Sequence, residues 1–123
     1  MKITLLGNPV TKKNHSQIVE NGGKRRLIPS QQYRAYEEKC LWQITAPKRQ
    51  MLAEPVELTC LYYMGTRRKV DLCNLLAATC DILVKAGVLA DDNSQIVCSM
   101  DGSRVFYDKE NPRVEIEIKR WEP

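Results

Sequence analysis

Four short segments of the chain have a pattern of hydrophobic and polar positions that indicates β-strands. In the last of them Val114, Ile116 and Ile118 alternate with charged residues, which is typical of a strand with one buried face. An earlier segment alternates in part, and the other two contain β-branched residues that favour strands. We therefore predict strands at residues 3–6, 56–64, 95–107 and 113–121, with residues 108–112 as a hairpin loop between the last two.

Two segments have apolar residues at helical spacing. The first covers residues 31–44 and follows Ser30, a residue type that caps helix N-termini. The second covers residues 72–86, is rich in Leu and Ala, and stops at Gly87. Because this second segment is apolar almost all round, we expect it to be buried against a sheet or at a subunit interface.

A polar and basic stretch separates the first strand from the first helix. Asn21-Gly22-Gly23 at its centre is a hairpin-turn sequence, so residues 17–19 and 26–28 form either a small basic hairpin or a flexible loop. The remaining elements follow in the order β, α, β, α, β, β. We expect one α+β domain over residues 1–123, with a mixed sheet covered by two helices.

Composition narrows the function classes without selecting one. The chain is 43% hydrophobic, which is enough for a core, and its 19 Lys and Arg exceed its 15 Asp and Glu, which permits a polyanionic partner. No apolar run is long enough for a signal peptide or a membrane span, so we expect no membrane partner. Five scattered cysteines without a CxxC pair favour buried free thiols in a reducing cytoplasm.

Three aspartates are candidates for chemistry. Asp71 follows three basic residues at the start of the second helix, and Asp91 and Asp92 lie in a polar turn after it. From Asp71 to Gly87 a helix is about 24 Å long, so a shared metal ion requires tertiary folding or a second subunit. From the residues alone, a helix cap for Asp71 and an ordinary turn for the other two remain simpler explanations. Asp81, within the helix, is better explained by a structural ion pair or hydrogen bond.

The order and spacing of these residues resemble those of a known family. The sequence Arg67-Arg68-Lys69-Val70-Asp71-Leu72-Cys73-Asn74-Leu75 is followed by Asp81-Ile82-Leu83, Gly87, Asp91-Asp92 and Gln95-Ile96-Val97. This pattern is similar to that of the RusA family of Holliday-junction resolvases. The opening Gly7-Asn8-Pro9-Val10-Thr11-Lys12-Lys13 also resembles phage members of that family.

The resemblance implies a RusA-like homodimer that binds four-way DNA junctions and cuts them symmetrically in recombination and repair. It implies a divalent metal, Mg²⁺ with Mn²⁺ as a second option, held by Asp71 and Asp92, with Asp91 as a weaker candidate. The resemblance also implies a prophage origin and a location in the cytoplasm, either of a bacterium or of a phage-infected host cell. The residues expected to contact DNA phosphates are Lys12, Lys13, Arg67, Arg68 and Lys69.

Two positions depart from the family pattern. Cys73 stands where the family has a second motif Asp, and Ala77 stands where it has a lysine. Mg²⁺ prefers oxygen ligands, and alanine brings no charge to a phosphate. An alternative function is therefore a junction-binding protein with weakened or no cleavage. A small scaffold protein without a nucleic-acid role is a third hypothesis.

Overall fold

A mixed sheet of five strands forms the base of the molecule. The computed structural model describes residues 1–12 and 16–123, and only the backbone of residues 16–21 and 24–29. The sheet strands are β1 (Lys2–Leu6), β4 (Val56–Met64), β5 (Val97–Ser99), β6 (Arg104–Tyr107) and β7 (Arg113–Arg120). Strand β7 pairs antiparallel with both β1 and β4, whereas β5 and β6 pair parallel with β4. The sheet order is β1-β7-β4-β5, with β6 beside β4 on the β5 edge.

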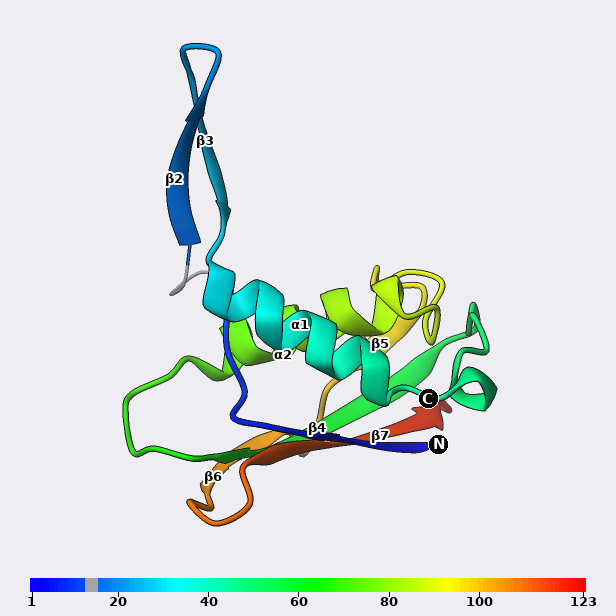
Figure 1. Cartoon of the computed structure of the whole chain (residues 1–123). Coiled ribbons are helices and arrows are strands. Elements are labelled where there is room, and N and C mark those ends of the chain that lie inside the picture. Colours follow the sequence, from blue (N-terminus) through cyan, green and yellow to red (C-terminus); the bar gives the residue numbers. More distant parts are fainter. Residues whose placement is uncertain (13–15) are drawn as a thin grey trace.

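Two helices lie on one face of this sheet (Figure 1). They are α1 (Gln31–Gln43) and α2 (Leu72–Lys85), and a 3-10 turn η2 (Ala46–Lys48) follows the first. The Ser30 hydroxyl accepts a hydrogen bond from the Tyr33 amide at 3.1 Å, which confirms Ser30 as the N-cap. The expected α+β fold, a mixed sheet covered by two helices, is confirmed.

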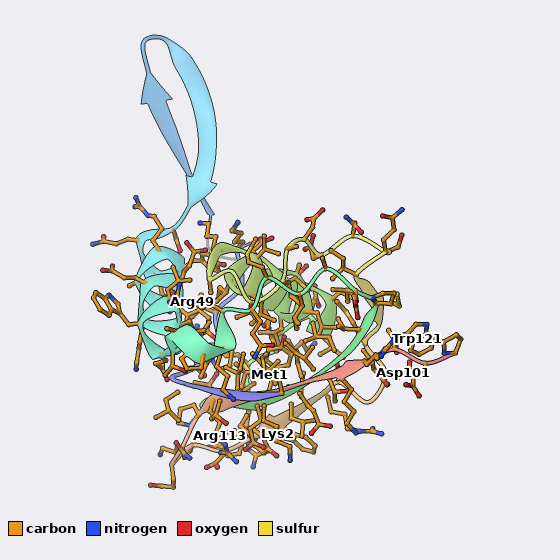
Figure 2. The ribbon with its side chains drawn as sticks, turned by 90° about the vertical axis from the view of Figure 1, so that its right-hand side faces the viewer. Met1, Lys2, Arg49, Asp101, Arg113 and Trp121 are labelled. Atoms are coloured by element: carbon orange, nitrogen blue, oxygen red, sulfur yellow. The ribbon has the colours of Figure 1, made fainter. Side chains whose placement is uncertain are left out.

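The core lies between the helices and the sheet, and Figure 2 shows the side chains that fill it. On β4 the buried positions alternate with partly exposed ones, as the sequence pattern predicts. No helix formed by the described residues covers the opposite face of the sheet, and Lys2 and Arg113 lie on that side (Figure 2). The largest fully buried side chains include Tyr33, Tyr62, Leu58, Leu75, Ile82, Leu83, Leu89 and Ile116.

Helix α2 is buried on one side and exposed on the other. Its buried residues pack against the sheet, whereas Cys73 and Ala77 are exposed. Inside the core, the hydroxyls of Tyr62 on β4 and Thr79 on α2 are 2.6 Å apart and hydrogen-bonded. Thr79 also donates to the carbonyl of Leu75 at 3.0 Å, so this buried polar pair is satisfied.

A β-hairpin extends away from the rest of the molecule (Figure 1). Its strands are β2 (Ser16–Asn21) and β3 (Lys24–Pro29), paired antiparallel with Asn21 opposite Lys24. Gly22 and Gly23 form the two-residue turn with φ of 60° and 78°. A turn with positive φ at both central residues fits the twist of a hairpin, and glycine adopts it without strain. The hairpin prediction is confirmed, and the flexible loop is not observed.

Two predictions in the C-terminal third are wrong. Residues 95–107 form two short strands, β5 and β6, because the chain turns at Gly102, whose φ is 82°. Residues 108–112 are not a hairpin loop, since β6 and β7 lie on opposite sides of β4. This loop instead crosses the end of β4, where the Asp108 amide donates to the Met64 carbonyl at 2.9 Å.

The five cysteines are free thiols in two different environments. Cys40, Cys60 and Cys80 are buried, as expected, but Cys73 and Cys98 are exposed. Among the described residues no helix is both long enough and apolar enough to cross a membrane.

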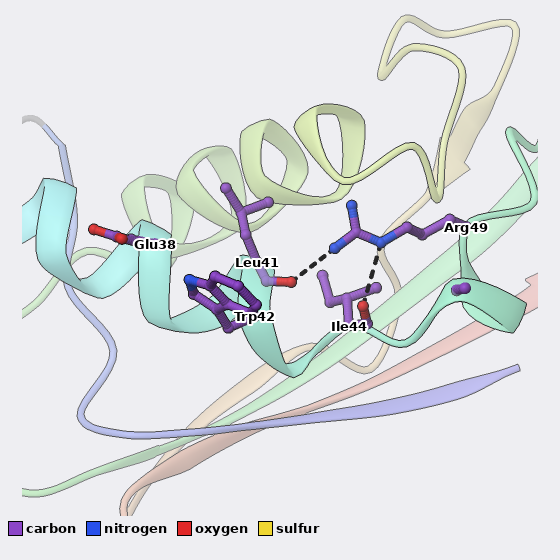
Figure 3. A pocket seen from close by; sticks show the side chains of 6 residues that line it. Glu38, Leu41, Trp42, Ile44 and Arg49 are labelled. Atoms are coloured by element: carbon purple, nitrogen blue, oxygen red, sulfur yellow. Dashed lines mark hydrogen bonds between the residues drawn. The ribbon is translucent and has the colours of Figure 1, made fainter.

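Arg49 ties the C-terminal ends of the two helices together. Its guanidinium donates to the carbonyls of Leu41 and Ile44 at 2.8 and 3.2 Å, at the end of α1 (Figure 3). It also donates to the carbonyl of Ala86, the C-cap of α2, at 3.1 Å. The last carbonyls of a helix have no intrahelical partner, so one cation satisfies both helix ends.

Arg49→Met is expected to lower the free energy of unfolding by about 1–3 kcal/mol, because three carbonyls lose a charged donor. Arg49→Lys should recover only part of this, since an ammonium lacks the planar fork of the guanidinium. Urea unfolding measures both values. The control is Lys109→Met, which removes an exposed cation from the 108–112 loop. Equal stability of Arg49→Met and this control would contradict the role of Arg49.

Candidate nucleic-acid and metal site

Asp71 lies at the N-cap position of α2, but its carboxylate does not cap the helix. The backbone carbonyl of Asp71 accepts from the amides of Asn74 and Leu75, both at 3.1 Å. The carboxylate is exposed and accepts a bond from the Asn74 side chain at 3.3 Å. A capping role therefore does not account for this carboxylate, which is open to solvent two residues after the basic segment 67–69.

Asp91 serves the turn in which it lies. One of its carboxylate oxygens accepts from the Asp92 amide at 2.9 Å and the other from the Asn93 side-chain amide at 2.7 Å. These bonds favour the charged form and hold the pKa of the Asp91 carboxyl below its ordinary value. Asp92 is exposed beside it. Of the two, Asp92 is the better candidate for binding something outside the chain.

Asp71 is the N-cap of α2, whereas the Asp91–Asp92 turn follows the C-terminal end of that helix. Burial raises the pKa of the Cys80 thiol, and the negative charge of Asp92 raises it further, to about 12. From Asp71 to Cys80 is about 13 Å along the helix axis, whereas metal–oxygen bonds are about 2–2.6 Å.

No group of three or more His, Cys, Asp or Glu is placed to hold a metal ion in the described part of the chain. The assignment of Asp71, Asp91 and Asp92 to one metal ion therefore stays a prediction. Among the residues that the structure describes, one chain therefore provides no cluster of three such donors around Asp71 or Asp92.

The expected cationic residues have different local partners. Lys12 forms an ion pair with Asp81, with the atoms 3.0 Å apart, and lies over the Tyr33 ring. This pair confirms the structural interpretation of Asp81. The guanidinium of Arg67 stacks on the Tyr107 ring, 4.0 Å from its centroid. Lys13 lies outside the described residues.

Arg68 and Lys69 line a polar hollow of about 520 Å³ next to the start of α2. Asn8, Thr11 and Gln32 line it too, from the segment after β1 and from the first turn of α1. Sequence reasoning missed these three residues as site candidates. The only sequence feature that pointed to two of them was the family-like opening segment, and nothing in the sequence places that segment beside residues 68–69.

A second hollow, of about 460 Å³, lies beside Trp42 at the other end of α1 (Figure 3). Arg49, the one cationic residue among those that line it, is hydrogen-bonded to backbone carbonyls, and Glu38 adds a negative charge to the lining. This hollow is therefore poorly suited to a polyanion, and the basic candidate surface is the one at the start of α2.

A comparison with family models matches residues 7–119 to endodeoxyribonuclease RusA. The chain belongs to the RusA family. No curated protein sequence matches it. The matched range includes Asp71, the Asp91–Asp92 turn and the basic segment 67–69, so the residues singled out above lie within the part of the chain that matches the family.

The hydrogen bond between the Asn93 side chain and the Asp91 carboxylate of this RusA-family chain can be tested through the pKa of Asp91. Because the Asn93 side chain helps to lower the Asp91 pKa, Asn93→Ala should raise it toward the ordinary value. A lowered carboxyl pKa stabilises the fold above the unfolded-state pKa, and this stability is lost as pH falls through the lower folded-state pKa. NMR titration of the carboxyl carbon in metal-free buffer measures the shift. An Asp91 titration that is identical in Asn93→Ala and wild type would refute the bonding described here.

Proposed function

We propose that this RusA-family protein is a structure-selective endonuclease that cuts four-way DNA junctions symmetrically during recombination and repair. The observation that carries the proposal is the exposed Asp71 carboxylate two residues after the basic segment Arg67-Arg68-Lys69, in a chain of the RusA family. A carboxylate beside phosphate-binding cations is the arrangement that metal-assisted phosphodiester hydrolysis needs. The proposed setting is the cytoplasm of a bacterium or a phage-infected cell.

The basic residues would hold the DNA backbone. Arg68 and Lys69 are exposed and face the polar hollow, and Arg67 is positioned by its stack on Tyr107. Contacts to phosphates position the DNA and make binding depend on salt, but they do not read sequence. Recognition of junction shape fits such a surface. Lys12, in the segment between β1 and β2, would extend the proposed basic surface, and Lys13 is proposed as a phosphate contact from its sequence position alone.

The proposed metal site is completed by a second protomer. Asp71 and the side-chain oxygen of Asn74 provide oxygen donors at the start of α2, and Asp92, with Asp91 as the weaker donor, would come from the partner. Oxygen donors suit Mg²⁺ or Mn²⁺. When bound, such an ion polarises the phosphate and lowers the pKa of a water ligand. In a two-fold dimer this exchange of residues occurs twice and produces two equivalent sites.

Mixing two inactive variants tests the shared site. Asp71→Asn and Asp92→Asn should each abolish Mg²⁺-dependent cleavage of a synthetic four-way junction, because each removes a charged ligand. In mixed dimers one site loses both aspartates and the other keeps both. About one quarter of the wild-type sites should therefore return, seen as nicks in single strands on a denaturing gel.

Asp101→Asn, an exposed carboxylate in the turn between β5 and β6, is the matched control and should cleave normally. If the mixture of inactive variants stays inactive although mixed dimers form, the site is not shared. Full activity of Asp71→Asn would refute the nuclease assignment of this carboxylate.

A second candidate function is junction binding with weak or no cleavage. It is favoured by Cys73 and Ala77, which are both exposed and lie one helical turn apart in the first two turns of α2. A thiol is a poor ligand for Mg²⁺, and alanine cannot contact a phosphate by charge.

Under this second function the wild-type chain binds junctions in a salt-sensitive way without nicking them. The double variant Cys73→Asp with Ala77→Lys should then gain cleavage, because it supplies an oxygen ligand and a cation. The measurement is the rate of Mg²⁺-dependent nicking beside the affinity for the same junction. Equal cleavage by wild type and the double variant would favour the active nuclease.

A further inference from the structure

The polar hollow beside residues 68–69 has the composition of an anion site. Its volume is about 520 Å³, and its lining is contributed by three segments that are distant in the sequence. Its two charged lining residues, Arg68 and Lys69, are both cations.

Thr11 supplies an independent indication of a ligand. Thr11 is one of the residues that line this hollow, and the residue is only 2% exposed. Its hydroxyl oxygen has no hydrogen-bond partner within the described part of the chain. Buried hydroxyls are nearly always paired, and leaving one unpaired costs free energy. An acceptor in the hollow would remove that cost.

The backbone adds positive potential at the same place. Helices α1 and α2 both begin at this end of the molecule (Figure 1), and Gln32 in the first turn of α1 lines the hollow. Helix N-termini carry partial positive charge and unpaired amides that favour anions. Asn8 is fixed there because its side-chain oxygen accepts from the Gly65 amide at 2.7 Å, which leaves its NH₂ group as the donor.

We propose that this hollow binds one phosphate group of the DNA backbone, with the Thr11 hydroxyl as a donor and Arg68 and Lys69 as the neutralising cations. A phosphodiester fits because it offers several acceptor oxygens to donors that converge from different segments, and a negative charge to two cations. The proposal rests on the proposed function for the identity of the ligand as DNA. It adds a defined phosphate position, beside Asp71 on the same connection between β4 and α2.

The first experiment uses inorganic phosphate and needs neither metal nor cleavage. Thermal unfolding is followed against phosphate concentration, with chloride at equal ionic strength as the reference. Wild type should show a saturable rise in Tm, because a ligand that binds only the folded state stabilises it. Thr11→Val should lose this rise yet be no less stable without phosphate, since valine removes an unpaired hydroxyl at similar volume.

Arg68→Ala is a second variant at an exposed position and should also lose the phosphate effect. Lys109→Ala, an exposed cation in the loop between β6 and β7, should keep it. A wild-type Tm that responds to phosphate no differently from Thr11→Val and Arg68→Ala overturns the site.

The second experiment tests the DNA backbone as the source of the phosphate. Binding of a four-way junction is measured against salt concentration without divalent metal. Thr11→Val should weaken binding about tenfold or more with an unchanged salt slope, because it removes a hydrogen bond to a charged group but no charge. Arg68→Ala should weaken binding and reduce the slope by about 1.

Neutral methylphosphonates placed singly near the crossover locate the contacted phosphate. At one position the substitution should weaken wild type but not Thr11→Val. If phosphate stabilises the protein through Thr11 while no junction position couples to Thr11, the hollow takes free phosphate and the DNA assignment is wrong. Loss of cleavage in Asp71→Asn together with unaltered phosphate and junction binding in Thr11→Val would leave the nuclease function standing and refute the hollow.

Discussion

The packing of α2 on β4 is the constraint on which the rest of the structure depends. Strand β4 pairs with β7 on one side and with β5 and β6 on the other, so its buried face is the centre of the core. The hydrogen bond between Tyr62 and Thr79 joins this strand to α2 inside that core. Because β5 runs parallel to β4, the chain must return through α2 to the other end of the sheet. Asp71 is therefore left at the carboxyl end of β4, and the Asp91–Asp92 turn at its amino end.

Most of the fold could be predicted because its main elements are periodic. The alternation over residues 56–64 and 113–120 and the apolar run of α2 each specify a buried face, and the observed elements agree within a few residues. The prediction was wrong in residues 95–112, where the pairing of a strand depends on which other strand lies next to it. Nothing within residues 95–112 shows that β6 will pair parallel with β4. The Asp101-Gly102 pair is a local turn sequence inside the predicted strand.

The candidate site was predictable only in its local parts. The basic segment before Asp71 is contiguous in the sequence, and both the segment and the Asp91–Asp92 turn could be found there. The hollow was not predictable, since it joins Asn8 and Thr11 to Gln32 and to residues 66–70 through tertiary folding. The sequence also left open whether Asp71 serves as a helix cap. The structure answers this, because the carboxylate makes no cap hydrogen bond.

Asp71 precedes α2 and the Asp91–Asp92 turn follows it, and this separation restricts how a symmetric dimer could combine them. A two-fold axis that brings Asp71 of one protomer to Asp92 of its partner also brings Asp92 of the first to Asp71 of the second. Two sites of identical composition then arise from one contact, with their spacing set by the length of α2. A junction with two equivalent strands to be cut presents the same symmetry. A site complete within one chain would leave the positions of the two cuts to the dimer contact alone, whereas a shared site makes assembly of the dimer a condition for cleavage. The position of Asp71 before α2 and of the Asp91–Asp92 turn after it is therefore compatible with the proposed site shared between two protomers.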